Sequence, residues 1–131
     1  MDIADSLNQL LESDELIGEM FYSVFLASCP QVQEHFAQVD MRRQAVILTM
    51  SLIVVEQYAN NPMPATHTYL EFLGDKHRKL GIPNELYEPW KQTMLRTLSE
   101  FHGNDWNPKL ADQWDHALQT SIDVLTKPPA S

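Results

Sequence analysis

The chain has 131 residues, of which 44% are apolar, so it can bury one hydrophobic core and is not a disordered polymer. Eighteen acidic residues against nine Lys and Arg residues give a formal net charge of −9. This charge argues against nucleic acid and anionic membrane surfaces as partners, because both repel an acidic protein. We expect a single domain over residues 1–131, with a Pro-rich tail at 127–131.

Cysteine content and hydropathy indicate the compartment. The single cysteine, Cys29, excludes an internal disulfide and a cysteine-based metal cluster, and its apolar neighbours predict a packed thiol. The acidic start of the chain lacks the basic segment of a signal peptide, and the longest apolar run, 45–55, is too short to span a bilayer. We therefore expect a cytoplasmic protein with no membrane partner.

Apolar residues recur at helical rather than alternating spacing in almost every segment, which predicts an all-α fold. The first helix is short, and its apolar face comprises Ile3, Leu7, Leu10 and Leu11. Ser13 and Asp14 are predicted to cap a second helix, whose inner face comprises Ile17, Phe21, Val24 and Phe25. Pro30 either ends that helix or begins another short one.

The segment 41–58 is the most apolar helix of the chain, and its apolar residues extend beyond one stripe. Burial on more than one side is therefore expected for it. Its main stripe comprises Ala45, Leu48, Leu52 and Val55. The Asn-Asn-Pro-Met-Pro sequence at 60–64 ends this helix, and the next one carries His77 and ends at a corner over 81–83.

Two long helices are predicted to close the chain. The first runs from position 84 or 88 to position 102, with Pro89 in its first turn or at a kink. The second begins with Asn107 as its cap and Pro108 in its first turn, and it ends at the prolines 128 and 129. Its apolar residues at helical spacing are Leu110, Trp114, Ala117, Ile122 and Leu125.

His77 is the candidate metal ligand. It lies in the last turn of its predicted helix, with Leu73 four residues earlier on the same face and Gly81 four residues later. A single inward histidine is more often a core side chain with its hydrogen bonds satisfied than a metal ligand. The rest of the chain therefore decides which role is expected for His77. The other histidines fall at loop, helix-end or polar positions, where a solvated role is expected: His35, His67, His102 and His116.

The second predicted helix carries the aromatic pair Phe21-Tyr22, and Pro30 and Phe36 follow it. These residues are similar to an aromatic pair, a helix break and a ring-packing phenylalanine of the globin family, and the sequence most closely resembles the bacterial single-domain globins and the haem domain of flavohaemoglobins. Gln44 and Leu48 resemble the two positions that face the open side of the iron. The resemblance covers nearly the whole chain and implies a globin fold, with helices packed around a haem pocket and a shortened first helix.

The other side of the implied pocket is formed by Lys76 and His77, followed by Leu80, Ile82 and Tyr87, which look like the proximal segment of the family. The resemblance implies haem b as cofactor, with the imidazole of His77 on the iron. The opposite position of the iron would then be open to a diatomic gas ligand: O2, NO or CO.

Tyr22 and Gln44 carry the expectation about oxygen. Oxygen gains anionic character on ferrous haem, so a hydroxyl or amide donor stabilises it by about 1–3 kcal/mol through a charge-assisted hydrogen bond. Leu48 would limit the pocket volume one turn beyond Gln44, and Phe36 would pack against the porphyrin. Without such a ligand, Tyr22 would be a buried aromatic bonded to a backbone carbonyl, and Gln44 a surface amide beside two arginines.

The sequence also departs from the family. The chain stops at Ser131 and has four glycines with no G-x-G-x-x-G motif, so it is expected to carry no reductase and to need an external electron donor. The last-helix glutamate of the family would fall within the Lys-Pro-Pro sequence at 127–129, which supplies no carboxylate. Trp90 stands where a smaller apolar residue is usual, which would narrow the pocket.

The favoured function is that of a haem-binding, oxygen-binding single-domain globin, as a monomer or weak homodimer. It would store or deliver oxygen, or oxidise nitric oxide to nitrate with an external reductase. One alternative is a gas-sensor domain cut from a larger signalling protein, against which the short first helix counts. The other is a haem-free globin-like interaction module, which would keep the helical stripes but would not need His77.

Overall fold

The computed structural model describes residues 1–127, so the tail expected at 127–131 lies outside the described residues beyond Lys127. The elements are α1 (Ile3–Glu12), α2 (Ile17–Ser28), η1 (Pro30–Phe36), α3 (Met41–Asn60), α4 (Pro64–Lys79), η2 (Asn84–Leu86), α5 (Tyr87–His102), η3 (Gly103–Asp105) and α6 (Pro108–Thr126). No strand occurs between residues 1 and 127, and the predicted all-α fold with a short first helix is confirmed. None of the helices in this range is long and apolar enough to cross a bilayer.

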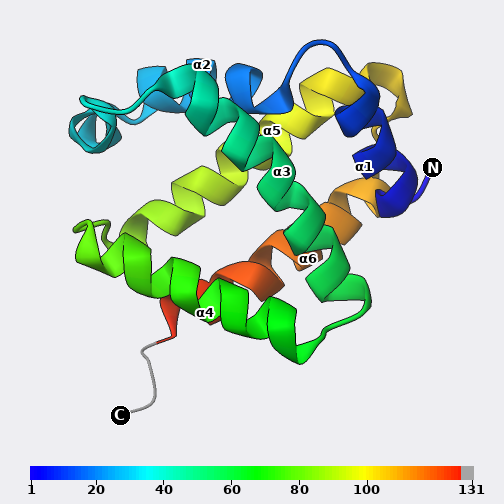
Figure 1. Ribbon diagram of the computed structural model, residues 1–131. Coiled ribbons are helices and arrows are strands. Elements are labelled where there is room, and N and C mark those ends of the chain that lie inside the picture. Colours follow the sequence, from blue (N-terminus) through cyan, green and yellow to red (C-terminus); the bar gives the residue numbers. More distant parts are fainter. Residues whose placement is uncertain (128–131) are drawn as a thin grey trace.

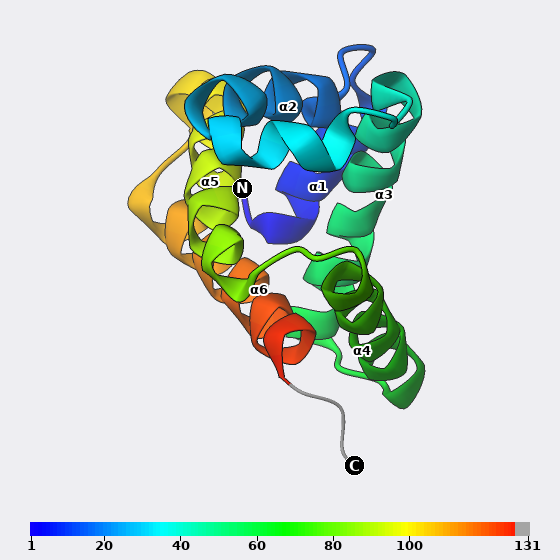
Figure 2. The same ribbon diagram turned by 90° about the vertical axis from the view of Figure 1, so that its left-hand side faces the viewer.

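The helices form two crossed groups around a central space. Helix α2 lies across one end of the molecule, α3 and α5 extend away from it, and α4 and α6 cross near the opposite end (Figure 1). Seen from the side, α5 and α6 form one flank and α3 and α4 the other (Figure 2). The main helix pairs in contact are α3 with α6, α2 with α3, α4 with α6 and α2 with α5.

Local chemistry accounts for most helix ends. The side chain of Asp40 accepts hydrogen bonds from two backbone amides at the start of α3, and that of Asn107 accepts one from Leu110 at the start of α6. Pro108 occupies the first turn of α6, and Pro30 begins η1, as the missing N–H of proline permits. Pro89 lies in the first turn of α5.

The predicted start of α2 is wrong. Ser13 ends α1 in an extended conformation, and α2 begins at Ile17 after Leu16, with no side-chain cap. The Ser13 hydroxyl instead accepts a hydrogen bond from the amide of Glu15 in the connecting turn. Leu11 also departs from the predicted apolar face of α1, because its side chain is exposed to solvent.

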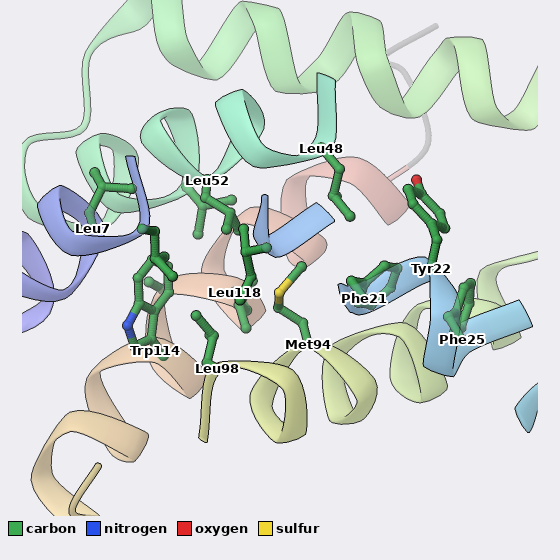
Figure 3. Packing of buried hydrophobic residues seen from close by; sticks show 14 of the residues in the cluster. Leu7, Phe21, Tyr22, Phe25, Leu48, Leu52, Met94, Leu98, Trp114 and Leu118 are labelled. Atoms are coloured by element: carbon green, nitrogen blue, oxygen red, sulfur yellow. The ribbon is translucent and has the colours of Figure 1, made fainter. Parts of the chain in front are cut away.

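The larger cluster of buried side chains joins α1, α2, α3, α5 and α6. Trp114 lies at one end with Leu7 and Leu52, and Tyr22 lies at the other end (Figure 3). The buried stripe of α6 is the predicted one, Leu110, Trp114, Ala117, Ile122 and Leu125, to which Leu118 and Ser121 are added.

Two helix pairs approach so closely that only glycine fits between them. A Cβ atom on Gly18 of α2 would overlap the backbone carbonyl of Ala45 in α3. A Cβ atom on Gly74 of α4 would likewise overlap the backbone carbonyl of Leu125 in α6. At both crossings the helix backbones are therefore in direct contact, which fixes how one helix sits on the other.

Helix α3 is buried along one stripe, whereas burial on more than one side was predicted. Ala45, Leu48, Leu52 and Val55 are buried as expected, but Val46, Ile47 and Met50 are 43%, 49% and 51% exposed. The helices that contact α3 are mainly α1, α2 and α6, with fewer contacts to α4, and no helix among the described residues buries these three side chains. Helix α3 thus carries more apolar side chains than its contacts with the other helices bury.

A buried polar group joins α1, α5 and α6. Ser6 accepts a hydrogen bond from the indole N–H of Trp114 at 2.9 Å, and its hydroxyl lies 2.6 Å from Nε2 of His102. His102 is only 7% exposed, and Trp106 stacks on its ring. The solvated role predicted for His102 is therefore wrong, because α1 and α6 close over the end of α5.

We expect this histidine to make folding stability depend on pH. Burial lowers the pKa of His102 below its ordinary 6.5, so as the pH falls the unfolded chain takes up a proton that the folded chain resists. The free energy of unfolding should therefore decrease between about pH 7 and about pH 5. His102→Gln keeps a hydrogen-bonding side chain without a charge, and urea titrations should show a shallower pH dependence in this variant.

His116→Gln is the matched control, because His116 is exposed on α6. It should reproduce the pH dependence of the original protein. An equal pH dependence in His102→Gln and the unsubstituted chain would show that His102 does not contribute.

Candidate functional site

A cavity of about 500 Å³ lies between the helices. Among the described helices, α2, α3, α4, α5 and α6 all contribute side chains to its lining, together with η1 and the corner after α4. All nine residues that the sequence singled out line this one cavity: Tyr22, Phe36, Gln44, Leu48, Lys76, His77, Leu80, Ile82 and Tyr87. The fold thus brings together side chains that are up to 65 residues apart in the chain, from Tyr22 to Tyr87.

The lining is mostly apolar, and part of it is open to solvent. Val39, Ile47, Tyr69 and Leu80 line the cavity, although their side chains are exposed, Leu80 by 60%. A monomeric protein rarely leaves several large apolar side chains uncovered around one opening unless a ligand or partner covers them. The volume also falls within the range of about 300–1,000 Å³ that is usual for small-molecule and cofactor sites.

His77 lies on the α4 side of the cavity, where the end of α4 fixes its backbone. The amide of Ile82 donates to the carbonyl of His77 at 3.0 Å, and the amide of Gly81 donates to the carbonyl of Arg78. Together with the positive φ of Gly81, 80°, these bonds form a Schellman motif, which ends the helix at Lys79, two residues after His77. This motif forms the corner that the sequence predicted at 81–83.

The imidazole of His77 is held at one nitrogen. Its Nδ1 lies 2.8 Å from the hydroxyl of Tyr87, the first residue of α5. No hydrogen bond joins Nε2 to any part of the chain that the structure describes. Burial lowers the pKa of His77, and the neighbouring charge of Lys76 lowers it further, so the imidazole is neutral at neutral pH. A neutral imidazole with Nε2 unengaged has the form that binds metals.

Tyr22 and Gln44 form the facing side, from α2 and α3. The Gln44 amide donates a hydrogen bond from Nε2 to the Tyr22 hydroxyl oxygen at 3.1 Å. Burial raises the pKa of Tyr22, so the phenol keeps its proton. Phe36 packs edge-on against the Tyr22 ring, with 5.3 Å between the ring centroids. Tyr22 is therefore bonded to a side chain rather than to the backbone carbonyl that we considered from the sequence.

The phenol of Tyr87 is also neutral. Burial raises the pKa of Tyr87 to about 12, and the charge of Arg78 offsets part of this effect. Both sides of the cavity thus carry a protonated tyrosine, one next to an amide and one next to an imidazole.

The sequence did not single out several other lining residues. His35, which was expected to be solvated, is partly buried and lines the cavity, because η1 turns it inward beside Phe36. Trp90, which was expected from the sequence to narrow the pocket, does line the cavity, and it contacts Phe21 edge-on. The remaining apolar lining residues on α3 and α4 repeat at helical spacing, a signal that could have identified them: Ile47, Val54 and Val55 on α3, and Tyr69, Leu70 and Leu73 on α4.

Two comparisons with known proteins place the chain. The family model described as Globin matches residues 18–125. The chain is also similar to a Pseudomonas aeruginosa PAO1 protein whose crystal structure is described as highly homologous in structure to a human haemoglobin. The two share 30% sequence identity with a TM-score of 0.83, over 95% of this chain and 92% of that one. The fold predicted from the sequence is confirmed, and the chain belongs to the globin family.

Proposed function

We propose that this globin binds haem b in the cavity and holds a diatomic gas between the haem and Tyr22. The observation that carries the proposal is the pairing of two facing sides in one apolar cavity. One side offers a neutral imidazole with Nε2 unengaged, and the other offers a phenol supported by an amide. Solvent-exposed Val39, Ile47, Tyr69 and Leu80 supply apolar surface that a flat cofactor would cover.

The available metal ligands support haem over a bare ion. Within residues 1–127, no group of three or more His, Cys, Asp or Glu side chains converges to hold a metal by itself. A single histidine suits a metal that brings its other donors in a porphyrin, and haem supplies an iron that binds gases on the face opposite that histidine. His77 fits this role through Nε2, since its Nδ1 would donate its proton to the oxygen of Tyr87.

Other lining residues would hold the haem by ordinary packing and charge pairing. Lys76 is exposed at the cavity rim and would pair with a haem carboxylate. Phe36, Leu48 and Ile82 would pack against the apolar faces of the ring.

On the gas side, we assign different roles to Tyr22 and Gln44. The Gln44 amide already donates to the Tyr22 oxygen, so the proton of the phenol is available to another acceptor. Tyr22 would donate this proton to bound oxygen, and Gln44 would orient the phenol. Carbon monoxide is less polar and would gain less from the same donor.

Substitution of the histidine tests the haem site. His77→Ala should lose haem or hold it weakly, because the other histidine of the lining, His35, comes from η1 and not from the α4 side of the cavity. Absorption spectra of the purified protein, before and after dithionite and carbon monoxide, measure the haem content. His67→Ala, on the same helix and bonded to Tyr58 instead, is the matched control and should keep the cofactor. Stoichiometric haem with an unaltered spectrum in His77→Ala would refute the assignment.

Removal of the Tyr22 hydroxyl tests the oxygen site. Tyr22→Phe should release oxygen about ten-fold faster or more, which corresponds to one charge-assisted hydrogen bond in a pocket of low dielectric. Its release of carbon monoxide should change much less. Stopped-flow dissociation measures both rates, and Tyr58→Phe serves as control because Tyr58 bonds His67 outside the cavity. Equal oxygen release in Tyr22→Phe and the unsubstituted protein would make Tyr22 a core aromatic only.

The contact between Gln44 and Tyr22 predicts a non-additive pair. Gln44→Leu should speed oxygen release less than Tyr22→Phe does, because the phenol remains. If Gln44 acts through Tyr22, the double variant should release oxygen no faster than Tyr22→Phe alone. A double variant whose rate is the product of the two single effects would instead mean that Gln44 contacts the gas independently.

A further inference from the structure

Helix α4 carries His77, yet it is held to the rest of the molecule mainly by α6. Figures 1 and 2 show α4 crossing α6, and α3 contacts α4 much less. The crossing is made at Gly74, whose backbone rests on the backbone of Leu125. The position of His77, three residues further along α4, therefore depends on how this crossing is maintained.

One side chain joins the last turn of α4 to the end of α6. Nη1 of Arg78 donates a hydrogen bond to the carbonyl oxygen of Leu125 at 3.0 Å, and it lies 3.5 Å from the carbonyl oxygen of Lys127. The carbonyls in the last turn of a helix have no partner within the helix, and they form the negative end of its dipole. The guanidinium of Arg78 donates a hydrogen bond to such a carbonyl and also places a positive charge at the negative end of the dipole.

The Arg78 contact lies beside the histidine and its partner. Arg78 follows His77 directly in the chain, and Tyr87 is the hydrogen-bond partner of that histidine. Here the end of α6 meets the last turn of α4 through backbone carbonyls and a cation.

We propose that Arg78 is a positioning residue, which fixes the last turn of α4 on the carbonyl end of α6 and thereby sets the orientation of His77. The role in haem ligation rests on the proposed function, whereas the contact between the two helices does not. The proposal is separate from the Schellman motif, because that motif orders the end of α4 internally and Arg78 ties it to another helix.

The first measurement uses the haem-free protein. In Arg78→Met the alkyl chain is retained but the donor and the charge are lost, so the last turn of α4 should open more often. Amide hydrogen exchange of residues 76–82 should accelerate at least about five-fold, while exchange in α2 and α5 stays the same. Lys79→Met is the matched control, since it removes a cation of the same turn that pairs with Asp75 at the surface.

The second measurement uses the haem-loaded protein. Transfer of haem to excess apomyoglobin should be about ten-fold faster from Arg78→Met, the effect of one charge-assisted hydrogen bond. The iron–histidine stretching band of the ferrous protein, measured by resonance Raman spectroscopy, should shift or broaden. Lys79→Met should change neither property.

The outcomes separate this proposal from the haem assignment. Unaltered amide exchange in Arg78→Met would overturn the contact itself, whether or not haem binds. Faster exchange and faster haem loss with an unchanged iron–histidine band would overturn the positioning role, because Arg78 would then only stabilise the fold. Retention of a normal spectrum by His77→Ala would refute the haem assignment and leave the exchange result to decide on the helix contact.

Discussion

The site depends on two places where helix backbones touch. Gly18 rests on Ala45, and Gly74 rests on Leu125, in both cases with no side chain between the helices. Tyr22 lies one turn after Gly18 on α2, and His77 lies one turn after Gly74 on α4. Because a close backbone crossing leaves the two helices little freedom to slide or separate, these two contacts fix the backbone positions of Tyr22 and His77. A larger residue at either glycine would push its helix away from the cavity.

The cavity remains open because the buried side chains form two separate clusters. One buried cluster, from Ile3 to Leu118 in the sequence, joins α1, α2, α3, α5 and α6, and a smaller one joins Leu70 of α4 to Tyr87, Ile122 and Leu125. Helix α4 contributes little to the larger cluster. Side chains at the opening, such as Leu80 and Ile47, consequently remain uncovered in the chain alone. A bound cofactor would bridge the two clusters and bury apolar surface that the chain does not cover itself.

Much of this could be predicted from one sequence because helices are encoded locally. The apolar periodicity, the caps at Asn107 and Pro108 and the helix-ending sequence at 60–64 gave an all-α chain with nearly correct boundaries. The prediction at Ser13 and Asp14 was wrong because a good capping residue can equally end the preceding helix. The exposed side of α3 was not predicted either, since hydrophobicity alone does not show which faces find a partner.

The sequence by itself therefore determined the helices, because residue type and spacing encode them, and its resemblance to the globin family indicated the nine residues that line one cavity. Only the tertiary structure decided which polar atoms meet. It placed the Gln44 amide on Tyr22, Tyr87 on His77, and Arg78 on the end of α6. It also buried His102, which the sequence suggested was solvated. These pairings join residues 10 to 96 positions apart, and their geometry follows from helix crossings that no local pattern specifies.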